Sequence, residues 1–269
     1  MTALTILAAF LRRDWGITRS YRFAYLFTIV ATLFHLAIYF FIGRLIDQTN
    51  LSGYEGLEQG YFSFAILGMV MLNLASTSLS TFSATLRTEQ TTGSLEALLA
   101  TPASPSLLIL GAALHSFFQA LLNGTIFISL AVIFFGVRFE TGLWLLMTAI
   151  VAVVALVVFF GAVGIAVAGF TIVFKQTGSM IGVVLYGLSL LGGVYFPIEI
   201  LPEPLRLLAA AVPLNWGLRI LRTALLDGEA QPLLLVPLVA AAVLSVPVAH
   251  VVFNAALGRA RRDGSLNQY

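Results

Sequence analysis

The stretch GLWLLMTAIVAVVALVVFFGAVGIAVAGFTI, residues 142–172, decides the fold class of this protein. It holds 31 consecutive residues without a charged side chain. An α-helix rises about 1.5 Å per residue, so about 20 apolar residues are enough to cross a hydrocarbon core about 30 Å thick. The stretch is therefore predicted to be a transmembrane helix.

Five further uncharged segments have the same character. They are residues 23–43, 61–82, 107–135, 180–196 and 232–257, and the shortest has 17 residues. The 26 charged residues of the chain, 14 Lys and Arg plus 12 Asp and Glu, all lie outside the six segments. Because lipid cannot satisfy the polar groups of an open backbone, the spans are expected to be helices. The predicted fold class is all-α, a polytopic membrane protein with six transmembrane helices in a single transmembrane domain over residues 1–269.

The composition excludes two broad classes of protein. Charged residues make up 10% of the chain and hydrophobic residues 59%, whereas an ordinary soluble domain has about 25% charged residues. A water-soluble globule is therefore excluded, and so is intrinsic disorder, which requires low hydrophobicity and high net charge. The chain has no cysteine, which also excludes disulfides and thiolate ligands.

The basic residues predict the orientation of the chain in the cell (inner) membrane. With six spans both termini lie on one side, and that side holds nine of the 14 Lys and Arg residues: Arg12, Arg13, Arg19, Arg22, Arg87, Lys175, Arg259, Arg261 and Arg262. Cytoplasmic segments are rich in Lys and Arg, so both termini are predicted to be cytoplasmic. These residues form no basic stripe, and no nucleic-acid partner is expected.

The two ends of the chain have separate predictions. Leu4, Leu7, Leu11 and Trp15 recur at three- and four-residue spacing, which favours an interfacial helix over residues 1–22 that lies on membrane lipids. The alternative is a simple N-terminal tail. Residues 258–269 are predicted to be a cytoplasmic tail.

The spans lack the residues that usually power transport or catalysis. Ion-coupled carriers keep acidic or basic residues within the membrane, and none lies in a span here. His35, His115 and His250 lack metal-ligand spacing, and the single lysine, Lys175, is not part of a phosphate-binding loop. We therefore expect no enzyme activity, metal or cofactor in this chain and an energy source in a partner protein.

The segment between the second and third spans, residues 83–106, is predicted to contain a short amphipathic helix. Gly93 or Ser94 can begin it, and Leu95, Leu98 and Leu99 form one apolar stripe. Such a helix needs a groove, which a partner protein can supply. The alternative is a loop helix that packs on the cytoplasmic ends of its own bundle.

The residues of this segment resemble a family signature. The pattern Glu89-x-x-x-Gly93-Ser94-Leu95-Glu96-x-Leu98-Leu99-x-Thr101-Pro102 is similar to that of the type-2 ATP-binding-cassette (ABC) permeases, the transmembrane subunits of exporters. The resemblance implies that residues 83–106 are a cytoplasmic coupling loop whose helix contacts an ABC ATPase subunit. The implied contact residues are Glu89, Gly93, Ser94, Leu95, Glu96, Leu98, Leu99, Thr101 and Pro102. The resemblance also implies two ATPase copies, which bind ATP and Mg, and a second permease copy or a related permease.

A second similarity to this family lies between the fifth and sixth spans. The segment from Gly192 to Pro202, followed by Pro213-Leu-Asn215-Trp216, resembles the outer-face segment of these permeases. The resemblance implies two short re-entrant helices within residues 197–231. The pieces 205–212 and 216–226 are apolar but too short and too rich in arginine to span a bilayer.

The resemblance further implies a dimer cleft lined by the first, second and fifth spans. The polar residues available there are His35, Tyr39, Asn73, Ser76, Thr77, Ser80, Tyr186, Ser189 and Tyr195. Together with many Leu, Val and Phe residues, they suit an amphipathic, lipid-like or drug-like substrate. The alternative is that Ser76, Thr77 and Ser80 only allow close packing and hydrogen bonding between helices.

The predicted function is that of a transmembrane permease subunit of an ATP-driven ABC exporter. The alternative is a non-transporting membrane scaffold or assembly factor with a permease-like fold. An ion-coupled carrier would need a buried acid or an internal repeat, and the sequence contains neither.

Overall fold

The structure is a computed structural model, and it describes residues 22–46, 57, 59–91, 105–174 and 178–262. These residues form α-helices and one short 3-10 helix, with no strand among them, which confirms the all-α prediction. In chain order they are α2 (Arg22–Leu45), α3 (Tyr61–Thr91), α5 (Pro105–Phe135), α6 (Leu143–Phe174), α7 (Gly178–Leu191), η2 (Ile198–Ile200), α8 (Glu203–Ala210), α9 (Pro213–Leu225) and α10 (Pro232–Arg262).

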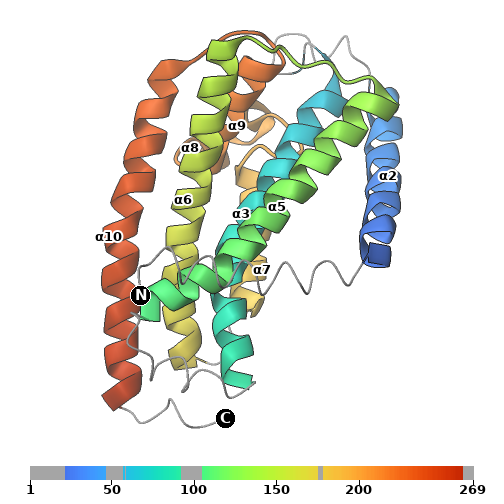
Figure 1. Ribbon diagram of the computed structural model, residues 1–269. Coiled ribbons are helices and arrows are strands. Elements are labelled where there is room, and N and C mark those ends of the chain that lie inside the picture. The colour runs from blue at the N-terminus through green and yellow to red at the C-terminus, as the bar shows by residue number, and fades with distance from the viewer. Residues whose placement is uncertain (1–21, 47–56, 58, 92–104, 175–177, 263–269) are drawn as a thin grey trace.

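Five of these helices are long and apolar enough to cross a membrane. The spanning portions among the described residues are Leu26–Leu45, Tyr61–Thr85, Ser116–Phe135, Leu143–Phe170 and Pro232–Ala256. They coincide with five of the six predicted spans. The first residues of α2 and the last of α10 lie at the same end of the bundle (Figure 1).

The fifth predicted span is shorter than the sequence suggested. The expected helix over residues 180–196 ends instead at Leu191, so α7 has 14 residues. It is about 21 Å long, less than the hydrocarbon core of about 30 Å. The prediction of a helix as far as Phe196 is wrong because the chain turns at Gly193, whose φ of +69° is a conformation that other residues rarely adopt.

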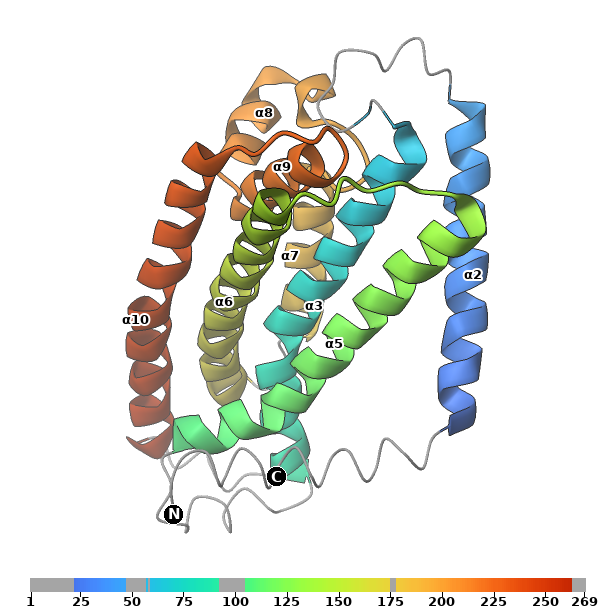
Figure 2. The same cartoon turned by 45° about the horizontal axis from the view of Figure 1, so that its top comes forward.

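The short helices α8 and α9 lie beyond the end of α7. Figure 2 shows them together at the end of the bundle opposite the start of α2. Their bounds, Glu203–Ala210 and Pro213–Leu225, lie within residues 197–231, where two short helices are predicted. Leu214, Leu218 and Ile220 of α9 are fully buried, and α9 packs against α6, α10 and α3.

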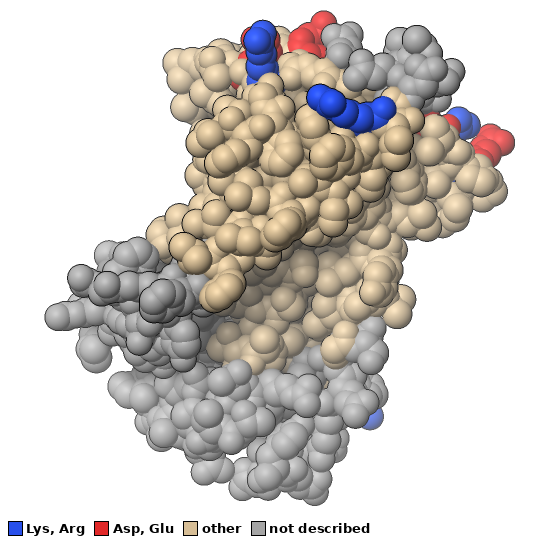
Figure 3. All heavy atoms as spheres, turned by 90° about the vertical axis from the view of Figure 1, so that its right-hand side faces the viewer, with Lys and Arg blue, Asp and Glu red and all other residues tan. Residues whose placement is uncertain are grey.

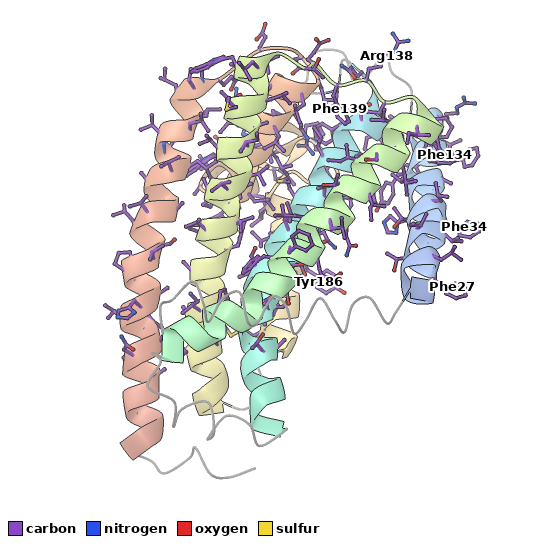
Figure 4. The ribbon with its side chains drawn as sticks, in the orientation of Figure 1. Phe27, Phe34, Phe134, Arg138, Phe139 and Tyr186 are labelled. Atoms are coloured by element: carbon purple, nitrogen blue, oxygen red, sulfur yellow. The ribbon has the colours of Figure 1, made fainter. Side chains whose placement is uncertain are left out.

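The centre of the bundle is α3, whereas α2 stands at its edge. α3 packs against α6, α5, α9, α2 and α7 and contributes Phe64, Ile66 and Leu67 to the core. In contrast, α2 packs mainly on α3 and α5 and exposes Phe27 and Phe34, which Figure 4 shows pointing away from the other helices. The helix α2 is therefore the least enclosed of the long helices.

The charged residues are distributed as a membrane would require. On the face that carries α2, Figure 3 shows acidic and basic side chains gathered at the upper end and an uncharged surface across the middle. Exposed apolar side chains cover α2, α7 and α10. This pattern agrees with a multi-pass membrane protein.

Candidate functional site

A cavity of about 560 Å³ lies between α2, α3, α5 and α7. Half of its 14 described lining residues carry hydrogen-bonding side chains, and none of these residues is Asp, Glu, Lys or Arg. The polar ones are Thr28, Thr32, His35, Asn73, Ser76, Asn123 and Tyr195, and the others are Ala31, Met69, Val70, Leu72, Gly124, Phe127 and Leu185. The wall is therefore amphipathic and has no carboxylate, ammonium or guanidinium group among its described residues.

Four residues predicted to line a substrate pathway meet in this cavity, and a fifth lies beside them. His35, Asn73, Ser76 and Tyr195 line it directly. The Tyr39 ring stacks on His35 at 5.4 Å and on Tyr195 at 6.0 Å, measured between ring centroids. These three rings connect α2 to the segment that follows α7. Their aromatic faces can stack on a flat or apolar part of a ligand.

The other four predicted pathway residues are not gathered there. Tyr186 is 80% exposed on α7 (Figure 4), and the Ser189 hydroxyl donates to the Tyr186 carbonyl oxygen over 2.8 Å. The Ser80 hydroxyl donates to the Ser76 carbonyl oxygen over 2.7 Å, within its own helix. Thr77 is half-buried and does not line the cavity. The Ser80 hydroxyl is thus bonded within α3 and makes no hydrogen bond to another helix in the described residues.

Three polar residues that line the cavity are not among those predicted from the sequence. Thr28 and Thr32 precede His35 and Tyr39 at spacings of four, three and four residues, which puts all four side chains on one face of α2. That polar stripe is a signal the sequence contains. Asn123 lies on α5, and it was missed because the resemblance assigned the pathway to the first, second and fifth spans only.

The residues predicted to contact an ATPase subunit fall mainly outside the described part of the chain. Glu89 lies in the last turn of α3, which extends to Thr91. Gly93, Ser94, Leu95, Glu96, Leu98, Leu99, Thr101 and Pro102 lie outside the described residues, as do residues 1–21 and 263–269. The end of α3 and the start of α5 lie at the end of the bundle opposite α8 and α9 (Figure 2).

A second feature of the site is the buried guanidinium of Arg222 on α9. Only 5% of this residue is exposed. Its Nη1 donates to the Gly193 carbonyl oxygen at 2.8 Å, and its Nη2 donates to the carbonyl oxygens of Phe64 at 3.1 Å and Val194 at 3.0 Å. Arg222 therefore joins α9, α3 and the turn after α7.

The electrostatics of Arg222 are dominated by its burial. Burial lowers the pKa of Arg222 to about 9, and the nearby Glu199 acts in the opposite direction. The side chain is thus protonated at neutral pH, and its charge is balanced by carbonyl dipoles and by the Phe64 ring beneath it. A buried charge held by several acceptors fixes the positions of those acceptors.

The close approach of the α7–η2 turn to α3 requires a small residue at position 68. A Cβ atom on Gly68 would overlap the Val194 carbonyl oxygen and come within 2.9 Å of Arg222 Nη2. The glycine therefore lets the Val194 carbonyl lie against α3, within reach of Arg222.

Comparison with known protein families identifies the family of this chain. A family model described as ABC-2 type transporter matches residues 6–226. The matched region includes the cavity residues, the loop with the Glu89 to Pro102 pattern, and Arg222. Among curated proteins, none matches the chain.

Proposed function

Because this chain belongs to the ABC-2 type transporter family, we propose that it is the transmembrane permease subunit of an ATP-driven exporter. Membership of the family implies partnership with an ABC ATPase subunit. The proposed assembly contains two ATPase copies and either two copies of this chain or one copy and a related permease.

In this assembly the ATP chemistry belongs to the partner. The sequence has no phosphate-binding loop, so ATP and Mg are proposed to bind the ATPase subunit and the chain itself is not an enzyme. The contact is proposed to be the coupling helix over Gly93 to Pro102. A movement of the ATPase would then reach α3 and α5, which begin or end next to that loop.

The uncharged cavity carries the proposal for the substrate. Its volume of about 560 Å³ falls within the range of about 300–1,000 Å³ typical of small-molecule sites. Amide, hydroxyl and imidazole groups can bind a polar part of a substrate, while Met69, Phe127 and Leu185 contact an apolar part. We therefore propose an amphipathic, lipid-like or drug-like substrate, because a bare ion would find no opposite charge in this wall.

The loose packing of α2 supports a change in access to the cavity. α2 provides three of the polar lining residues, Thr28, Thr32 and His35, yet it has few packing partners. A displacement of α2 relative to α3 would open or close the cavity with little loss of buried surface. Such rigid-body shifts of packed helices are a common form of conformational switching.

Substrate-stimulated ATP hydrolysis by the complex reconstituted in lipid tests the proposal. A panel of lipid-like and drug-like compounds should contain at least one that raises the hydrolysis rate, and Asn73→Ala should raise the concentration needed for half-maximal stimulation. Ser189→Ala is the matched control, because that hydroxyl bonds within its own helix. Binding of an ATPase without stimulation by any compound and without transport would favour the scaffold instead.

A further inference from the structure

A second cavity, of about 540 Å³, lies at the end of the bundle that carries α8 and α9. It is formed by the last turn of α2, the start of α3 and the loop after α5. It shares no lining residue with the cavity between α2, α3, α5 and α7. Along α2 the two are separated, since one uses residues up to His35 and the other begins at Phe40.

Three aromatic rings from three different helices line one part of this second cavity. Phe40 of α2, Phe62 of α3 and Phe135 of α5 have centroid separations of 5.3, 5.1 and 5.4 Å. Phe62 and Phe135 also pack on a buried cluster that includes Leu36 and Ile66. The rings therefore form a firm apolar wall between this cavity and the interior of the bundle.

Two arginines line the same cavity from different elements. Arg44 lies in the last turn of α2, with its guanidinium carbon 4.8 Å from the centre of the Phe40 ring. Arg138 lies in the loop after α5, and Figure 4 shows it at the same end of the bundle as Phe134. Among the described residues that line it, the one acid is Glu140, whose backbone N–H donates to the Leu225 carbonyl oxygen. The formal charge of these described lining residues is thus positive.

We propose that this second cavity binds a phosphate group, with the headgroup of an anionic phospholipid as its main source. Guanidinium groups match the geometry of phosphate oxygens and bind them through paired hydrogen bonds. Tyr and Trp gather where a membrane meets water, which is the depth that a lipid phosphate occupies, and Tyr61 lines this cavity. Phe41 and Phe134 are both more than 60% exposed beside the cavity and offer a surface to acyl chains.

Such a lipid would contact α2, α3 and the loop after α5 together. These elements meet at the aromatic wall, while the rest of α2 has few packing partners. A bound phosphate between Arg44 and Arg138 would therefore connect the end of α2 to the rest of the bundle. The inference does not depend on the substrate or on the direction of transport.

Native mass spectrometry of the purified, delipidated full chain tests the proposal. The probes are phosphatidylglycerol, diacylglycerol with the same acyl chains, and glycerol phosphate. The Arg44→Gln/Arg138→Gln pair should weaken phosphatidylglycerol binding roughly tenfold or more. Arg206→Gln, an exposed arginine of α8 outside this cavity, should leave binding unchanged, and Glu140→Gln should strengthen it.

The outcomes separate the sources of phosphate. Binding of phosphatidylglycerol but not glycerol phosphate, lost in the arginine pair, supports a lipid site. Binding of glycerol phosphate that needs the same arginines supports a site for a soluble phosphoester. Equal binding of diacylglycerol, or phosphatidylglycerol binding that the pair leaves unchanged, would overturn the proposal. Arg44→Lys/Arg138→Lys should bind phosphatidylglycerol more tightly than the glutamine pair and less tightly than the unchanged chain, because lysine keeps the charge but not the paired hydrogen bonds. This intermediate binding distinguishes loss of charge from misfolding.

Discussion

The guanidinium of Arg222 lies 3.3 Å from the centre of the Phe64 ring, and its Nη2 also donates a hydrogen bond to the Phe64 carbonyl oxygen. One residue of α3 thus binds the same cation through its side chain and its backbone. The remaining hydrogen bonds of Arg222 go to Gly193 and Val194 in the turn after α7. This arrangement makes Arg222 the main polar connection between α9 and the rest of the bundle within the described residues.

Replacement of Arg222 by glutamine should destabilise the protein by about 3 kcal/mol, because several buried carbonyl oxygens would lose their donor. The apparent Tm in detergent should fall by roughly 6–12 °C, given about 2–4 °C per kcal/mol for a chain of this size. Arg206→Gln, on the exposed surface of α8, should leave the Tm within about 1 °C. Equal shifts in the two variants would contradict the assigned role of Arg222.

Replacement of Gly68 by alanine should also destabilise the protein, by about 1–3 kcal/mol, because the new methyl group overlaps the Val194 carbonyl oxygen. Gly187→Ala is the matched control. A Cβ at Gly187, within α7, meets no atom within 4 Å, so that variant should be neutral or slightly more stable. Thermal unfolding monitored by tryptophan fluorescence compares the two, and a larger loss at Gly187 would refute the close approach of α3 to the turn.

Asn123 should behave like Asn73 in substrate binding, although α5 was not part of the expected pathway. Asn123→Ala should raise the substrate concentration for half-maximal ATPase stimulation about fivefold, the value expected for loss of one hydrogen bond of about 1 kcal/mol. Thr125→Ala on the same helix is the control, because its hydroxyl donates to the Leu121 carbonyl oxygen at 2.9 Å and lies outside the cavity. A similar change in both variants would point to a general effect on α5.

The predicted coupling helix can be tested by charge reversal. Glu96→Arg should reduce copurification of the ATPase subunit and its substrate-stimulated hydrolysis by roughly tenfold or more, since an interface contact would become repulsive or unpaired. Glu229→Arg provides the matched control, because this exposed residue follows α9, at the end of the bundle opposite the last turn of α3. Full coupling in the Glu96 variant would remove this residue from the interface.

The sequence predicts the long helices well because each is specified locally. Each of the five uncharged runs of 21 residues or more coincides with a helix that is long enough to cross a membrane. The end of α7 could not be predicted from the uncharged run, because that run continues to Phe196 while the helix ends at Leu191. The turn depends on contacts with distant residues, Gly68 and Arg222, which hydropathy does not reveal.

The candidate site was predicted only in part, for a similar reason. His35, Asn73, Ser76 and Tyr195 were selected as polar residues in particular spans, and they share one cavity. Tyr186 was selected on the same grounds but is 80% exposed. Which face of a helix points inward depends on its neighbours. Tyr186 and Ser189 share one face of α7 by their three-residue spacing, yet neither lines the cavity.

The early end of α7 has a mechanical consequence. A continuous helix transmits a displacement of one end to the other, but α7 is joined to η2 and α8 through the turn at Gly193. The carbonyl groups of this turn are held by Arg222 from the far side. A tilt of α7 about Gly192 and Gly193 can therefore occur while α8 and α9 stay in place. The helix α7 can then move independently of these two short helices.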